Sequence, residues 1–420
     1  MKILWFTNSP SKYDQGKHTY HGGGWIESLE ELVSGQDGLE LAVSFFHNDG
    51  FQKEHRGNTT YYPIFKKSAK KAPLTSIING WRGVVEPEEI IIPKLLKVID
   101  DFKPDIIHIF GTEGIFASIQ NKTNIPVVVH LQGLITPCLN AFFPPNQSRS
   151  SFIFSRNFIF KNLLGRGVFS SFKRFKRQSI REQLNLSHAK YIMGRTNWDN
   201  SVSKIYAPNA QYFHVDEVLR PLFYNEFKQE YKLKQTIIIV STLSDTIYKG
   251  IDVLLKTAKL LKGQKDINFK WQVIGLDKKS NLLHHFTRLL NINPEESNIE
   301  FLGKKDPKEL ISILLQADIF IHPSYIDNSP NSVCEAQIIG LPVIACNVGG
   351  LSTLIEHNKT GILVPSNGIF EIVSVLIDYT QQSEKYFFIG KNAREFALKR
   401  HNREAIIDDL KKSYLQIINN

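Results

Sequence analysis

The sequence has little cysteine and methionine and no long hydrophobic run. Of its 420 residues, three are cysteine and two are methionine. Cys138, Cys334 and Cys346 lie far apart, which argues against a metal cluster or a disulfide framework and favours free thiols in a reducing compartment. No stretch approaches the roughly 20 apolar residues of a membrane-spanning helix. The opening MKILWFTNSP predicts a short strand instead of a signal peptide, so we expect a cytoplasmic protein.

Two common ligand-binding motifs are also missing. The first predicted strand, 2–8, leads to Gly22, Gly23 and Gly24, which allow a ligand to approach the backbone closely but do not form G-x-G-x-x-G. This argues against a dinucleotide site. A flexible connector remains an alternative function for these glycines. No Asp-x-Asp motif stands in a suitable loop, so we expect no metal and no cofactor.

The chain does have a positive charge excess, concentrated in one segment. The net charge is +10, and residues 151–190 contain nine Lys or Arg and one acid, Glu182, which gives +8 of that total. Phenylalanines alternate with the cations through residues 142–183. Rings and cations together suit an anionic membrane surface, which we place at 151–181. The alternative is that the rings pack on the domain and the cations are solvated. Nucleic-acid binding is disfavoured because no known module surrounds the segment.

The order of predicted elements indicates an α/β protein. Short, continuously apolar strands alternate with helices, which is typical of parallel sheets covered by helices on both faces. The length exceeds one typical core and suggests two domains. We expect an N-terminal domain at 1–225, a C-terminal domain at 226–395 and a helical tail at 396–420.

The most informative stretch runs from Ala317 to Pro365. Predicted strands at 319–322, 342–346 and 361–364 surround a predicted helix at 330–339, with Ser329 as its N-cap and Pro330 at its first position. The helix would leave open N–H groups that attract phosphate, and Asp327 and Glu335 add carboxylates for hydroxyl groups. The open N–H groups would belong to Asn331, Ser332 and Val333.

This stretch resembles the donor-binding signature of family 4 of the retaining glycosyltransferases. That signature has an acidic residue, seven residues, Glu-Ala, and then Gly-Leu-Pro-Val and Val-Gly-Gly. Here it matches Asp327, Glu335-Ala336, 340–343 and 348–350, with Asp in place of the usual first Glu. The family also has Lys-Gly at a helix start, matched by Lys249-Gly250. Its Gly-Arg pair is replaced by Ser241-Thr242, so either Lys249 carries more of the phosphate charge or Arg195 or Lys304 substitutes.

The resemblance implies a GT-B fold, with two doubly wound, Rossmann-like domains facing across a cleft and the tail crossing back to the first domain. It implies donor binding by Glu335, by the helix N–H groups of 331–333 and by Gly23 and Gly24. It also implies catalytic roles for Asp327, Lys249 and His130. His130 ends a predicted strand at the edge where such sheets bind ligands, whereas His108 lies mid-strand and is expected in the core.

The implied reaction transfers a hexose-type sugar from a nucleotide-sugar to a saccharide, with retention of configuration, in surface polysaccharide biosynthesis. The basic aromatic segment suggests a lipid-linked acceptor and a peripheral location at the inner face of the membrane. Two alternatives remain. A GT-B nucleotide-sugar epimerase would form product from the donor alone, and a non-catalytic membrane-docking protein of the same fold would bind no nucleotide.

Overall fold

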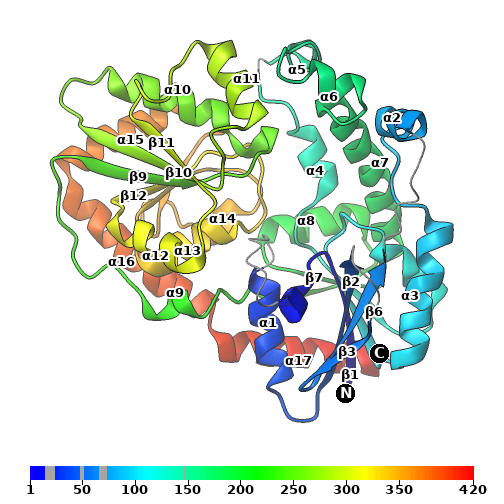
Figure 1. Cartoon of the computed structure of the whole chain (residues 1–420). Coiled ribbons are helices and arrows are strands. Elements are labelled where there is room, and N and C mark those ends of the chain that lie inside the picture. The colour runs from blue at the N-terminus through cyan, green and yellow to red at the C-terminus, as the bar shows by residue number, and fades with distance from the viewer. Residues whose placement is uncertain (15–23, 48–51, 66–72, 146) are drawn as a thin grey trace. The chain divides into compact units, whose positions relative to one another are not determined.

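The computed structural model describes residues 1–14, 24–47, 52–65, 73–145 and 147–420, which form two compact units (Figure 1). The first unit contains Met1–Leu139, Asn162–Val218 and His401–Asn420, and the second contains Asn140–Lys161 and Leu219–Arg400. The units therefore meet along the chain at 218/219, seven residues before the expected boundary. The tail joins the first unit at His401, five residues after the expected start. An excursion at 140–161, which the sequence did not indicate, belongs to the second unit.

The first unit is built on an eight-stranded sheet of order β3-β4-β2-β1-β5-β6-β7-β8. All neighbouring strands are parallel except the β3–β4 pair at one edge. The central strands are buried along almost their whole length, as expected for a parallel sheet covered on both faces. The strands are β1 (Lys2–Thr7), β2 (Glu40–His47), β3 (Glu54–Arg56), β4 (Thr59–Phe65), β5 (Ile106–Phe110), β6 (Val127–His130), β7 (Tyr191–Gly194) and β8 (Gln211–His214).

Helices connect these strands, and the last helix of the chain, α17 (Arg403–Asn419), also packs in this unit. Its buried residues Ile406, Leu410 and Tyr414 share one core with β1, β2 and β5. The other helices are η1 (Ser11–Asp14), α1 (Gly24–Ser34), α2 (Pro73–Arg82), α3 (Glu88–Phe102), η2 (Phe116–Lys122), α4 (Ile135–Asn140), α7 (Val168–Ser187) and α8 (Asn197–Tyr206), and α4 ends one residue beyond the unit boundary.

The second unit is a doubly wound domain on a fully parallel sheet of order β11-β10-β9-β12-β13-β14. Its strands are β9 (Ile237–Thr242), β10 (Phe269–Ile274), β11 (Ile299–Gly303), β12 (Ile319–His322), β13 (Val343–Cys346) and β14 (Ile362–Val364). Its helices are α9 (Leu222–Asn225), η3 (Ile247–Lys249), α10 (Ile251–Lys262), α11 (Asn281–Leu290), α12 (Pro307–Gln316), α13 (Asn331–Ile339), α14 (Leu351–Leu354), α15 (Ile369–Gln381) and α16 (Ser383–Arg400).

The excursion joins the second unit through aromatic contacts to α11. The segment contains α5 (Arg149–Ile153) and the first part of α6 (Ile159–Leu163). The rings of Phe152 and Phe158 lie 4.6 and 5.4 Å from the ring of His285, and Ser155 Oγ lies 2.9 Å from His285 Nδ1. Phe154, by contrast, is 74% exposed. Part of the basic aromatic segment is thus core and part is surface. Among the described residues, no helix has both the length and the apolar character to cross a bilayer.

Candidate functional site

The candidate site of the second unit lies where β9, β12 and β13 end. These strands are parallel neighbours, so the loops that follow them meet at the carboxyl edge of the sheet, where doubly wound domains bind ligands. Lys249 follows β9, Asp327 follows β12 and Gly349 follows β13. The topology therefore brings together three positions that are up to 100 residues apart in the sequence.

Lys249 and Asp327, both predicted from the sequence, form an ion pair. Lys249 Nζ donates to Asp327 Oδ2 at 2.5 Å, and His322 Nε2, from the end of β12, lies 3.1 Å from the same oxygen. Burial alone would raise the pKa of Asp327, but the Lys249 charge and the hydrogen bonds from His322 and Lys249 outweigh it and hold that pKa well below its ordinary value. Asp327 is therefore a carboxylate at neutral pH. Sequence analysis missed His322, although its place at a strand end was a usable signal.

Two glycines allow the loops to approach one another closely at this edge. Gly250 and Gly349 have φ of +77° and +54°, in the left-handed region that favours glycine. A Cβ on Gly250 would lie 2.1 Å from the carbonyl oxygen of Pro323, and one on Gly349 would lie 1.8 Å from that of Asp327. Gly350, the second glycine of the Val-Gly-Gly motif, has a negative φ and donates its N–H to the Asp327 carbonyl at 3.0 Å. The glycines thus position the Asp327 backbone.

The start of α13 differs from the prediction by one residue. Pro330 has φ −71° and ψ 116°, which is extended backbone, so Pro330 itself occupies the N-cap position and the helix begins at Asn331. The prediction that Ser329 is the N-cap was wrong. The N–H of Val333 donates to the Pro330 carbonyl at 2.9 Å, so Val333 does not supply an open donor. Asn331 and Ser332 remain at the first turn, where N–H groups have no partner within the helix.

Glu335 is already held by an arginine that sequence analysis did not single out. Arg220 donates from Nε and Nη2 to Glu335 Oε1 at 3.0 and 2.6 Å. Burial raises the pKa of Glu335 above its ordinary value, and the Arg220 charge opposes that rise. Arg220 precedes α9 and lies 115 residues from Glu335 in the sequence, so motif spacing gave no signal for the pair.

Ser241, which replaces the family's Gly-Arg pair together with Thr242, does not supply a substitute phosphate contact. Ser241 is fully buried, donates to the Ile321 carbonyl at 2.6 Å and accepts from Trp271 Nε1 at 3.1 Å. Its side chain therefore joins β9 to its neighbours inside the sheet and offers nothing to a phosphate. In the described part of this unit, Lys249 and Arg220 are cations that directly contact a predicted site carboxylate.

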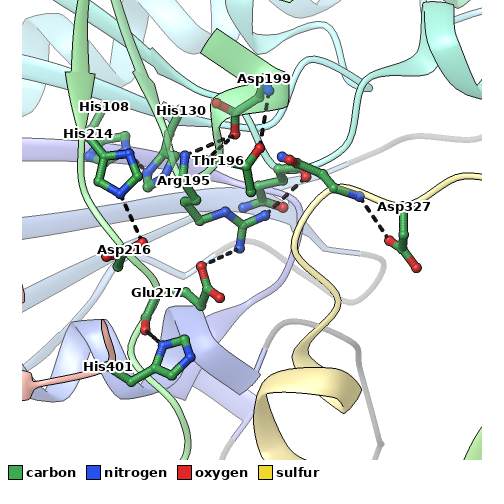
Figure 2. A network of polar contacts seen from close by, with 12 residues as sticks. His108, His130, Arg195, Thr196, Asp199, His214, Asp216, Glu217, Asp327 and His401 are labelled. Atoms are coloured by element: carbon green, nitrogen blue, oxygen red, sulfur yellow. Dashed lines mark hydrogen bonds and ion pairs between the residues drawn. The ribbon is translucent and has the colours of Figure 1, made fainter. Parts of the chain in front are cut away.

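The first unit has its own polar cluster at the carboxyl edge of β6 and β7 (Figure 2). His130 ends β6 and is fully buried, with the Trp25 ring 5.4 Å from its ring. Arg195 follows β7, lies 5.0 Å over the Trp25 ring and donates to the Gln132 carbonyl at 3.0 Å. Arg195 Nη1 also lies 3.7 Å from Glu217 Oε2. Arg195 thus has protein partners within its own unit.

Glu113 ties together three strand ends in the first unit. Its carboxylate accepts from Asn8 Nδ2, after β1, at 3.3 Å and from the N–H of Gly133, after β6, at 3.2 Å. Burial raises the pKa of Glu113 to about 7. Gly23 lies outside the described residues, and Gly24 opens α1. His130 and Gly24 belong to the first unit, whereas the other predicted site residues belong to the second.

Residues 224–396 match the family described as "Glycosyl transferases group 1". Over 99% of both chains, the protein is 23% identical to an uncharacterized glycosyltransferase of Methanocaldococcus jannaschii. A match of 26% identity covers 41% of this chain and 43% of the putative colanic acid biosynthesis glycosyltransferase WcaL of Escherichia coli. The family match therefore spans the six-stranded sheet of the second unit.

Solved structures give the fold of the whole chain. Sucrose-phosphate synthase of Thermosynechococcus elongatus superposes with a TM-score of 0.71 at 16% identity, covering 100% of this chain and 99% of that one. HepE of Anabaena, solved in complex with UDP-glucose, gives 0.62 at 16% identity, covering 99% and 100%. With two parallel sheets in the two units, these neighbours confirm the predicted GT-B fold of two Rossmann-like domains.

Proposed function

We propose that this glycosyltransferase moves a hexose-type sugar from a nucleotide-sugar to a saccharide acceptor with retention of configuration. The observation that carries the proposal is the Lys249–Asp327 pair beside the start of α13. A cation, a carboxylate and helix N–H groups at one sheet edge suit a ligand that has both phosphates and hydroxyls.

The chemical problem is the negative charge that develops on the departing diphosphate. Preorganised donors aimed at such charge supply much of an enzyme's rate gain. Lys249 and the N–H groups of Asn331 and Ser332 would meet the phosphates, Asp327 a hydroxyl of the transferred sugar, and Glu335 the ribose hydroxyls. We infer that the leaving phosphate accepts the acceptor's proton. Since protein donors can balance the charge, we also infer that no metal ion is needed.

From the family resemblance we also propose that His130 of the first unit binds the donor sugar or the acceptor. UDP-glucose is the first donor to test, because HepE, a structural neighbour, was solved with UDP-glucose. A saccharide acceptor in polysaccharide assembly is supported by the similarity to WcaL, a putative colanic acid biosynthesis glycosyltransferase, and to the amylovoran biosynthesis glycosyltransferase AmsK, which matches 36% of this chain at 28% identity.

We further propose that the acceptor is lipid-linked and that the protein docks on an anionic membrane surface. On α6, Phe160 and Leu163 are 74% and 58% exposed. Helix α2 packs against α7. Trp81 Nε1, on α2, donates to the carbonyl of Asn162, on α6, at 2.8 Å. Leu74 on α2 is 73% exposed. Glu182, the acid within 151–190, is fully buried, so the exposed charges of that segment are cations. Exposed rings and cations together fit anionic lipid.

The decisive test is nucleotide-sugar binding and transfer in wild type and Lys249→Met. Thermal-shift measurements with UDP-, GDP- and ADP-sugars should show stabilisation of wild type by one nucleotide class. With that donor, Lys249→Met should lose about 100-fold in kcat/KM, because it removes a cation that meets the leaving group. Lys259→Met, at an exposed position on α10, is the matched control and should behave like wild type.

Each alternative function gives a different result in this test. A protein that no nucleotide-sugar stabilises would contradict the enzyme proposal. Product formed from the donor without acceptor would identify an epimerase. Equal kcat/KM in Lys249→Met and Lys259→Met would show that the role assigned to Lys249 is wrong.

A further inference from the structure

Four buried side chains in the first unit form a continuous hydrogen-bonded chain that ends at His130. Trp5 Nε1 donates to Tyr414 Oη at 3.1 Å, and Tyr414 Oη lies 2.5 Å from His108 Nδ1. His108 Nε2 then lies 3.1 Å from His130 Nδ1. All four residues are fully buried. Figure 2 shows the rings of His108 and His130 beside one another.

The direction of this chain can be deduced from its first donor. An indole N–H can only donate, so Tyr414 Oη accepts from Trp5. The phenol hydrogen must then find an acceptor, because a buried polar hydrogen without one is costly. Within the described residues, the acceptor in contact with that hydroxyl is His108 Nδ1. His108 therefore carries its own hydrogen on Nε2 and donates it to His130 Nδ1.

The opposite direction leaves more groups unsatisfied. If His130 Nδ1–H donated to His108 and His108 Nδ1–H donated to Tyr414, the Tyr414 oxygen would accept two hydrogens and its own hydrogen would have no acceptor in the described core. Both directions form three hydrogen bonds, but the opposite one leaves the phenol hydrogen unsatisfied in a fully buried place. The outward direction, from Trp5 to His130, is thus favoured by about fivefold or more in population.

The two imidazoles and the phenol keep their neutral forms. Burial lowers the pKa of His108 to about 3 and lowers that of His130 well below its ordinary value, with the charges of His108, Arg195 and His214 acting in the same direction on His130. Burial also raises the pKa of Tyr414 far above its ordinary value. Both imidazoles are neutral and the phenol keeps its proton, so each ring nitrogen is either a donor or an acceptor.

We propose that Tyr414 and His108 are positioning residues that lock His130 in the tautomer with hydrogen on Nε2, so that His130 donates a hydrogen bond to an oxygen of the saccharide substrate. The Nε2 atom is buried and has no hydrogen-bond partner among the described residues, so its donor is available. The substrate half of this inference rests on the proposed function. In this tautomer His130 cannot accept a proton at Nε2, which agrees with the leaving phosphate acting as the base.

The hydrogen-bonded series from Trp5 to His130 also gives α17 a role in the chemistry. Tyr414 is on α17, more than 280 residues after His130 in the sequence, and its ring packs against His108 at a centroid distance of 5.7 Å. A hydrophobic residue there could fill the same core space. A hydroxyl there selects one of two tautomers at the candidate site.

The test is nitrogen NMR of the imidazoles in protein labelled with 15N-histidine, which needs no substrate. In wild type, His130 should show a protonated Nε2 and an unprotonated Nδ1 across the neutral pH range. In Tyr414→Phe, which keeps the ring and removes only the hydroxyl, His108 loses its fixed donor and His130 should become a mixture of tautomers. Tyr386→Phe, at a buried tyrosine of the second unit that donates to Asp378 at 2.7 Å, is the matched control and should leave His130 unchanged.

Kinetics then separate positioning from simple destabilisation. Tyr414→Phe should lower kcat by about fivefold, with donor KM changed by less than about twofold, because a hydrogen bond made in the transition state is lost from part of the population. A wild-type His130 with hydrogen on Nδ1 would overturn the proposal even if the enzyme transfers sugar. So would an unchanged tautomer in Tyr414→Phe. Absence of any transfer activity would instead refute the proposed function and leave the NMR result readable.

Discussion

The carboxyl edges of the two sheets are built in different ways. In the second unit, Asp327 receives its contacts from His322, five residues earlier, and from Lys249, 78 residues earlier in the same domain. In the first unit, His130 is reached through His108, Tyr414 and Trp5, a set that spans residues 5 to 414. One edge is built from residues of a single domain, and the other depends on the two ends of the chain.

The two edges should therefore respond differently to substitutions. The edge of the second unit is exposed to ligand and stabilised by charge, so substitutions there should alter binding first. At the edge of the first unit, the groups that reach His130 are buried and neutral, so substitutions among them should act through packing and hydrogen-bond direction. Variants that affect one edge and leave the other intact can test whether the two are independent.

The largest expected effect comes from loosening α17. Leu410 is fully buried in the core that α17 shares with β1 and β2. Leu410→Ala should lower the free energy of unfolding of the first unit by about 3 kcal/mol, because it removes buried methyl groups and leaves a cavity. Hydrogen exchange should show faster exchange in β1 and β5 and unchanged exchange in β9 and β12.

Leu415→Ala is the matched control, since Leu415 lies on the same helix and is 54% exposed. It should change neither unit measurably. Equal loss of protection in β1 and β9 after Leu410→Ala would show that the two units unfold together and would remove the basis of the comparison.

A smaller effect is expected from Arg220→Ala in the second unit. The substitution leaves the buried Glu335 carboxylate without its cation, so the pKa of Glu335 should rise further and its hold on a substrate hydroxyl should weaken. Donor KM should rise about tenfold with kcat changed much less, the pattern of lost ground-state binding. Steady-state kinetics with the donor found by thermal shift would measure this.

Two further variants serve as comparisons for Arg220→Ala: the conservative Arg220→Lys and the control Arg288→Ala. Lysine keeps the charge without the planar fork, so Arg220→Lys should lie between wild type and Arg220→Ala. Arg288 is an exposed arginine of α11, and its removal should leave donor KM unchanged. An unaltered donor KM in Arg220→Ala would mean that Glu335 does not bind the donor.

The sequence placed Asp327 and Lys249 after strands of the second unit, because each lies in a motif with strict spacing. Asp327 and Lys249 meet as a parallel sheet requires. The Arg220 contact was missed, since a residue on the connection between the units has no periodic or motif signal. The N-cap at Pro330 was missed because serine is among the preferred N-cap residues, which favoured Ser329. The extended ψ of Pro330 places the start of the helix one residue later, at Asn331.

The first unit's edge was predictable only in part. His130 was identified from its place at a strand end, but its partner His108 was assigned to the core alone. The contact between them follows from β5 and β6 being neighbours, with Phe110 opposite His130. The contact with Tyr414 follows from α17 packing in this unit. The side chains that direct a hydrogen bond depend on tertiary packing, which residue spacing does not encode.

The smallest effect concerns Glu113, which joins strand ends in the first unit. Burial raises its pKa from 4.5 to about 7 in the folded protein. Between those values the folded state keeps a proton that the unfolded state has released, so the free energy of unfolding falls as pH rises from 4.5 to about 7. Glu113→Gln keeps a neutral group there and should remove this slope, making the variant more stable than wild type above pH 7 by about 1 kcal/mol, since Glu113 is partly exposed.

Denaturant unfolding of wild type and Glu113→Gln at several pH values would measure that slope, with Asp37→Asn, at an exposed position, as the control. The pH dependence should change in the first unit and stay constant in the second, because Glu113 contacts Asn8 and Gly133. A Glu113→Gln variant that is less stable than wild type at high pH would show that Asn8 and Gly133 require a carboxylate. Glu113 would then be a charged anchor of this edge, and the first edge would depend on a buried carboxylate just as the second depends on Asp327.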